Sequence, residues 1–132
     1  MWRHGVFICF LTLLLPAMAL AATPLRAGQP ISESLVDCAM LFTITNRAEP
    51  RRANHGKGYA LDRAKDEMLI AAQARARQEG RDDAERYVAD LATAKADKWD
   101  AKGMRYVLTQ DYRDWMGYCA SLIDHLDLEL MD

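Results

Sequence analysis

The sequence predicts an all-α fold: a small helical bundle of about four helices, with one disulfide linking the first and last helices. Apolar residues recur every three or four positions along most of the chain after residue 31, which is the spacing of one helix face. No segment alternates apolar and polar residues for long enough to predict a strand. Residues 104–109 are the only short candidate, and an isolated strand would lack a partner.

Residues 1–21 have the order of a cleaved signal peptide. Arg3 gives a positive start, an apolar run follows over residues 6–15, and small residues at A-x-A spacing come next. We favour cleavage after Ala21, with cleavage after Ala19 as the alternative. The apolar run of about ten residues is shorter than the roughly 20 that span a bilayer, so we expect no stable membrane anchor.

The leader also sets the compartment that we expect. A short signal rich in Ala and Leu favours the periplasm over the extracellular medium. Cys9 leaves with the leader, so Cys38 and Cys119 remain, and in an oxidising compartment they should pair. They are too far apart in the sequence for a C-x-x-C redox motif, so we interpret the pair as structural.

The mature chain is expected to be one domain. Residues 22–31 contain proline and glycine and predict an extended lead-in, and residues 32–132 predict a single helical domain. Ser32 is the predicted N-cap of the first helix. The second helix is expected over residues 59–79, with Gly80 as its C-terminal cap.

The second half of the chain predicts two further helices. Asp82 and Glu85 have the spacing of a capping box at the start of the third helix, and Gly103 ends or bends it. Thr109 can cap a fourth helix. Residues 104–108 are therefore either the first turn of that helix or a connector, and the sequence leaves both open.

Two features predict a binding surface. The main loop, residues 49–58, is basic and exposed, and the last helix is rich in Tyr and Trp, which are frequent in binding hot spots. Most of these aromatic side chains are expected in the core, and any exposed one is a contact anchor. The candidate partner surface comprises Arg51, Arg52, Lys57, Tyr112, Trp115 and Tyr118.

Several chemistries find no support in the sequence. There is no glycine-rich phosphate loop and no G-x-S-x-G motif, so we expect neither an enzyme nor a cofactor. His125 has no second His at helical spacing, which argues against a metal site. Met40 and His125 would lie about 12 Å apart along antiparallel helices, too far to share a haem iron. The net acidic charge argues against nucleic-acid binding.

The function that we expect is a contact with another protein. The chain is interpreted as an exported, non-enzymatic interaction module whose oligomeric state the sequence does not indicate. One alternative is an acid-stress chaperone-like protein, because the chain carries 19 Asp and Glu residues that acid would neutralise. Another is a small-ligand or metal-binding bundle, with His55 and His125 as contributors.

Overall fold

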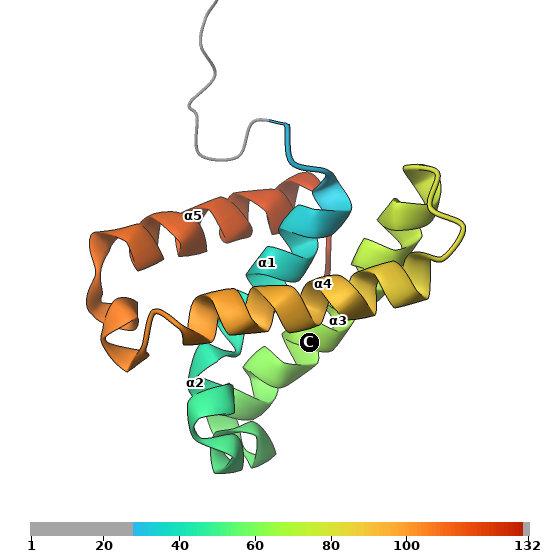
Figure 1. The fold of residues 1–132 in the computed structure, drawn as a ribbon. Helices are drawn as coiled ribbons and strands as arrows, with labels where there is room; N and C mark the ends of the chain where they lie inside the picture. Colours follow the sequence, from blue (N-terminus) through green and yellow to red (C-terminus); the bar gives the residue numbers. More distant parts are fainter. Residues whose placement is uncertain (1–27, 131–132) are drawn as a thin grey trace, which may run out of the picture.

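The computed structural model describes residues 28–130, so the predicted signal peptide lies outside the described residues. Within this range the chain forms five α-helices and two 3-10 helices and no strand, which confirms the all-α class (Figure 1). The elements are α1 Ile31–Phe42, α2 Ile44–Ala48, η1 Pro50–Asn54, α3 Gly56–Gln78, α4 Ala84–Asp100, η2 Met104–Leu108 and α5 Gln110–His125. None of the helices in this part of the chain is long and apolar enough to cross a membrane.

Helix α1 lies at the centre of the bundle. It packs against α3, α4 and α5, and Figure 1 shows α4 crossing in front of α3, with α5 above them. Nine of the twelve α1 residues are buried. A helix that is apolar around most of its circumference is stable only when neighbours surround it, as they do here.

Helix α3 packs closely against α1 through a stripe of buried residues that is mostly alanine. Four of its buried residues recur at every fourth position: Ala64, Met68, Ala72 and Ala76. Because alanine ends at Cβ, the two helix axes can approach closely along this stripe.

An aromatic cluster joins α4, η2 and α5. Trp99 is fully buried, stacks on Tyr106 with ring centroids 5.7 Å apart, and meets Trp115 edge-on at 4.9 Å. Both geometries are favourable for aromatic rings. These contacts hold the second half of the chain together.

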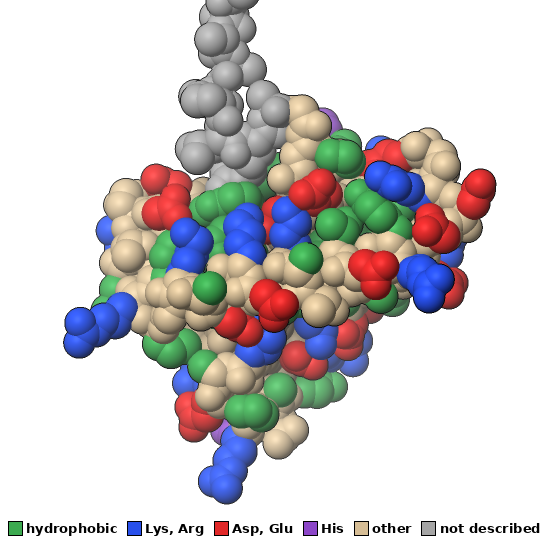
Figure 2. Space-filling view, in the orientation of Figure 1, with side chains coloured by type: hydrophobic (Ala, Val, Ile, Leu, Met, Phe, Trp, Pro, Cys, Tyr) green, Lys and Arg blue, Asp and Glu red, His purple; other side chains and the backbone are tan. Residues whose placement is uncertain are grey.

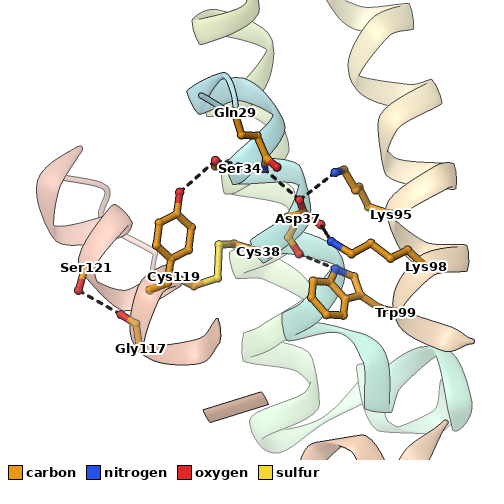
Figure 3. The surroundings of a disulfide bond; sticks show 11 residues. Gln29, Ser34, Asp37, Cys38, Lys95, Lys98, Trp99, Gly117, Cys119 and Ser121 are labelled. Carbon is orange, nitrogen blue, oxygen red and sulfur yellow. Dashed lines mark hydrogen bonds and ion pairs between the residues drawn. A yellow bond between two sulfur atoms is a disulfide. The ribbon is translucent and has the colours of Figure 1, made fainter. Parts of the chain in front are cut away.

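The disulfide is formed as predicted. Cys38 of α1 bonds to Cys119 of α5, and both residues are fully buried (Figure 3). The bond closes a loop of 81 residues between the central helix and the last one. It holds α5 against α1 at a point where both helices are buried in the core.

The predicted N-cap at Ser32 is wrong. Helix α1 starts two residues earlier, with Pro30 at the cap position, and Ser32 is fully buried. The backbone N–H and the hydroxyl of Ser32 both donate to the carboxylate of Glu79, just past the end of α3. A distant carboxylate therefore takes the place of a local cap.

The helix boundaries of the second half differ in part from expectation. The capping box at Asp82 and Glu85 is wrong, because Asp83 is the cap residue of α4 and its side chain makes no capping hydrogen bond. Gly80 and Gly103 follow α3 and α4 with φ of 91° and 74°, the left-handed conformation that ends helices. Residues 104–108 are the connector η2, and the Thr109 side chain accepts from the Tyr112 N–H at 3.2 Å to cap α5.

A buried carboxylate ties α1 to α4. Asp37 is fully buried, and its Oδ1 accepts from Lys98 Nζ at 3.0 Å (Figure 3). Its Oδ2 lies 2.9 Å from Lys95 Nζ and accepts from Gln29 Nε2 at 3.0 Å. The Trp99 indole N–H also donates to the Asp37 carbonyl oxygen at 3.2 Å. Every polar atom of this buried group therefore has a partner, which the burial of a charge requires.

Lys95 is the least exposed cation of this network, with 13% of its side chain accessible. It also donates to Glu33 Oε1 at 2.6 Å. Burial is the strongest single influence on Lys95 and favours its neutral form. The hydrogen bonds to Glu33 and Asp37 and the charges of both carboxylates outweigh that influence, so the pKa of Lys95 is raised above its ordinary value.

The raised pKa of Lys95 predicts a loss of stability at alkaline pH. The folded state holds this proton more tightly than the unfolded state does. Its contribution is therefore complete below the unfolded-state pKa and is lost as pH rises through the folded-state pKa. We expect Lys95→Met to lower the free energy of unfolding at pH 7 by about 1–3 kcal/mol. The difference from wild type should narrow above about pH 10.

Urea unfolding of both proteins from pH 7 to strongly alkaline pH measures this difference. Lys57→Met is the matched control, because Lys57 is exposed at the start of α3. The free energy of unfolding of Lys57→Met should change with pH in the same way as that of wild type. If the difference in free energy of unfolding between wild type and Lys95→Met stays constant across the alkaline range, deprotonation of Lys95 does not cause the loss of stability.

Candidate functional site

The exposed basic side chains of the 49–58 segment gather on one turn. We call Arg51, Arg52, His55 and Lys57 the basic turn; all four are exposed, on η1 and at the start of α3. Figure 2 shows Lys and Arg side chains projecting at the lower end of the molecule, where Figure 1 places α2 and the adjoining end of α3. The one carboxylate of this segment, Glu49, lies 3.9 Å from Arg52 with both side chains largely in solvent. The turn is therefore a net positive surface.

The geometry of η1 explains why its arginines face outward. A 3-10 helix has three residues per turn, so Pro50 and Ala53 share one face. Both line the same pocket against α1 and α3. Arg51 and Arg52 occupy the remaining faces and are exposed.

Gly58 holds the basic turn against α3. A Cβ built on Gly58 would lie 2.0 Å from the Arg52 carbonyl oxygen and 3.0 Å from Asn46 Oδ1, so no other residue fits without displacing the turn. On the other side, Asn46 Nδ2 donates to the Gly58 carbonyl at 2.8 Å. Helix α2, the turn and α3 are thus locked together through one glycine.

Asn46 is the side chain that completes this lock. It is 5% exposed, and its Oδ1 is the one buried side-chain nitrogen or oxygen in the described residues without a hydrogen-bond partner. The local sequence predicts a loop here from Pro50 and two glycines, but neither Asn46 nor the close approach at Gly58 leaves a signal that sequence reasoning can use. Both were missed for that reason.

A pocket of about 390 Å³ lies beside the basic turn. Its apolar wall consists of Met40, Pro50, Ala53 and Leu69. The charged residues at its rim are paired within the fold: Lys65 Nζ lies 3.2 Å from both Asp62 and Asp66. The rim is therefore close to electrically neutral, in contrast to the turn beside it.

Arg47 closes the same rim from α2. Its guanidinium donates to Asp100 of α4 at 2.8 Å and to the Met40 carbonyl at 2.8 Å. It also donates to Thr43 Oγ1 at 2.9 Å. All of its polar contacts are with the fold, so Arg47 belongs to the scaffold of the pocket.

Lys65 shows how firmly the rim charges are held. Burial is the largest single influence and disfavours the charged form, but hydrogen bonds to Asp62 and Asp66 and their charges outweigh it. The pKa of Lys65 is consequently raised above its ordinary value. This lysine stays protonated and paired at physiological pH.

The aromatic residues predicted for the partner surface lie elsewhere. Trp115 is 9% exposed and belongs to the aromatic cluster with Trp99. Tyr118 is half-buried, and its hydroxyl donates to Ser34 Oγ of α1 at 3.0 Å. Tyr112 is also half-buried, lies edge-on to Tyr106 at 5.7 Å, and has its pKa raised by burial.

The six candidate surface residues therefore divide into two groups. Arg51, Arg52 and Lys57 are exposed on the basic turn, whereas Tyr112, Trp115 and Tyr118 contact the core from α5. Helix α5 lies at the opposite end of the bundle from α2 and η1 (Figure 1). The structure does not bring the two groups together.

The histidines do not form a shared site either. His55 lies between η1 and α3, and His125 is the last residue of α5. Both are exposed. Across residues 28–130, no three His, Cys, Asp or Glu side chains are grouped so that they could hold a metal ion.

Comparisons with protein-family models, curated proteins and solved structures found no match to this chain. The fold and the site define a small all-α domain with one disulfide and a rigid basic turn next to an apolar pocket.

The contacts of Gly58 predict opposite effects for two glycine-to-alanine substitutions. Gly58→Ala should lower the free energy of unfolding by about 1–3 kcal/mol, because the new methyl group overlaps the Arg52 carbonyl. Gly117→Ala should raise it by about 0.5–1 kcal/mol, because Gly117 is exposed within α5 and a Cβ there meets nothing. Urea unfolding measures both. Equal effects at the two positions would show that the turn does not press on α3.

Proposed function

We propose that this protein is an exported, non-enzymatic module that binds an acidic surface of another protein through the basic turn. The observation that carries the proposal is the close packing of an exposed basic segment on α3 at Gly58, where Asn46 also hydrogen-bonds. A fixed turn is suited to binding because little conformational freedom remains to be lost.

The charge of the turn indicates the kind of partner. Arg51, Arg52 and Lys57 are exposed, and the one carboxylate of their segment, Glu49, lies 3.9 Å from Arg52, so the segment presents net positive charge to solvent. Complementary charge accelerates encounter and excludes partners of the same sign. An acidic protein surface satisfies both conditions.

Two observations support export. The leader pattern of residues 1–21 is that of a signal peptide. The buried disulfide between Cys38 and Cys119 is typical of proteins in oxidising compartments. We place the protein in the periplasm in preference to the extracellular medium.

Charge reversal on the turn tests the proposal. The full chain carrying Arg51→Glu and Arg52→Glu is compared with wild type by cross-linking in its own compartment, followed by quantitative mass spectrometry. Partners of wild type should be recovered at least about tenfold less with the variant, because two attractive contacts become repulsive.

The matched control reverses two other exposed arginines, Arg86→Glu and Arg105→Glu, with the same change in net charge. Its partners should match those of wild type. The competing proposals, an acid-stress chaperone-like protein and a small-ligand or metal binder, do not require the turn. Equal losses in both double variants, or no loss in either, would rule out the basic turn as the binding surface.

A further inference from the structure

We infer that the pocket beside the basic turn receives one apolar side chain of the partner, and that acidic residues flank this side chain in the partner's sequence. The inference rests on the proposed function and deepens it. It assigns the pocket as the anchor site and the basic turn as the site that selects the neighbouring charges.

The shape and lining of the pocket favour an apolar occupant. Its volume of about 390 Å³ lies within the range of small-molecule and side-chain sites. Met40 and Leu69 line it from α1 and α3, and Pro50 and Ala53 from η1. A leucine or phenylalanine side chain entering this space would leave water for an apolar wall, which is favourable.

The charged residues that line the pocket already have partners within the fold, so the pocket does not favour a charged occupant. Lys65 is paired with Asp62 and Asp66, and Arg47 is paired with Asp100. A charged side chain entering the pocket would break these pairs or stay unpaired, and either result is unfavourable. The rim therefore selects for a neutral side chain.

The net positive charge lies on the residues of the same 3-10 helix that are next to those lining the pocket. Pro50 and Ala53 form the pocket wall, while Arg51 and Arg52 lie between them in sequence and face solvent. With a rise of about 2.0 Å per residue, the arginines lie within a few residues' reach of an extended segment anchored in the pocket. Carboxylates next to the anchor would meet the arginines.

We assign the pocket to a different protein, because the C-terminal segment of a second copy does not fit as the occupant. The C-terminal segment of this chain also combines acidic and apolar residues, with Asp127 and Glu129 among leucines. However, Leu126, Leu128 and Leu130 are half-buried against the protein's own core. They are not available as anchors.

Three synthetic peptides test the inference by NMR titration of the ¹⁵N-labelled mature chain. The first has a central leucine flanked by Asp and Glu, the second replaces the leucine by alanine, and the third replaces the acids by lysine. The leucine peptide should bind about tenfold or more tightly than the alanine peptide. It should also shift the amide signals of Ala53 and Leu69, and the lysine peptide should not bind.

A pocket-filling variant tests the pocket and leaves the charges of the basic turn unchanged. Ala53→Trp should bind the leucine and alanine peptides with equal affinity. Ala74→Trp, at an exposed position further along α3, should keep the wild-type preference.

Failure of the anchor pocket and failure of the proposed function give different results in these measurements. Equal binding of the leucine and alanine peptides by wild type would overturn the anchor pocket and leave the basic turn in place. Binding of the lysine peptide as tightly as the acidic ones would overturn the proposed function itself. Absence of binding by all three peptides at millimolar concentration would overturn both.

Discussion

The carboxylate of Asp37 is fully buried inside the bundle, so the protein must supply partners for its charge. It does so with Lys95 and Lys98 from α4 and with Gln29 from the segment before α1. The placement of these groups fixes the rotation and height of α1 relative to α4. Because α1 is also the helix that carries Cys38, the position of α5 follows from the same arrangement.

The position of the basic turn depends on α1 as well. Helix α1 ends at Phe42, and the Thr43 hydroxyl donates back to the Ala39 carbonyl at 3.0 Å, a bond typical of helix ends and bends. The chain restarts at once as α2, which delivers Asn46 to Gly58. Because Gly58 has no side chain, the Arg52 carbonyl and with it η1 can pack closely against the start of α3. The proposed binding surface is thus set by a series of contacts that begins at the central helix.

The fold class could be predicted because its signals are local. Helical periodicity can be recognised within a few residues, and so can the glycines that end helices at positions 80 and 103. The disulfide could be predicted because only two cysteines remain in the mature chain. Thr109 could likewise be recognised as a cap. The fourth predicted helix follows from these features, whereas the sequence left residues 104–108 open between a connector and a first helical turn. The short α2 was missed because the break at Thr43 leaves no proline or glycine as a marker.

The site could be predicted only in part, because its geometry depends on distant residues. Ser32 looked like a local cap, but Glu79, 47 residues away, engages it. The burial of Asp37 depends on the two lysines of α4, about 60 residues further along the chain, and leaves no local signal. Trp115 was a candidate anchor until the packing of Trp99 placed it in the core. The exposed basic residues were predictable, since charge and flanking proline predict exposure without any tertiary contact.

A double-mutant cycle between Asp37→Asn and Lys95→Met, measured by urea unfolding at neutral pH, tests most directly whether the buried carboxylate ties α1 to α4. We expect a coupling free energy of about 1–3 kcal/mol, because each substitution leaves a buried charge without its partner. The exposed pair Arg77 and Glu85, 3.4 Å apart, should show a coupling of about 0–1 kcal/mol in the same assay. A coupling free energy between Asp37 and Lys95 no larger than that of the exposed pair would show that the buried carboxylate does not tie the two helices together.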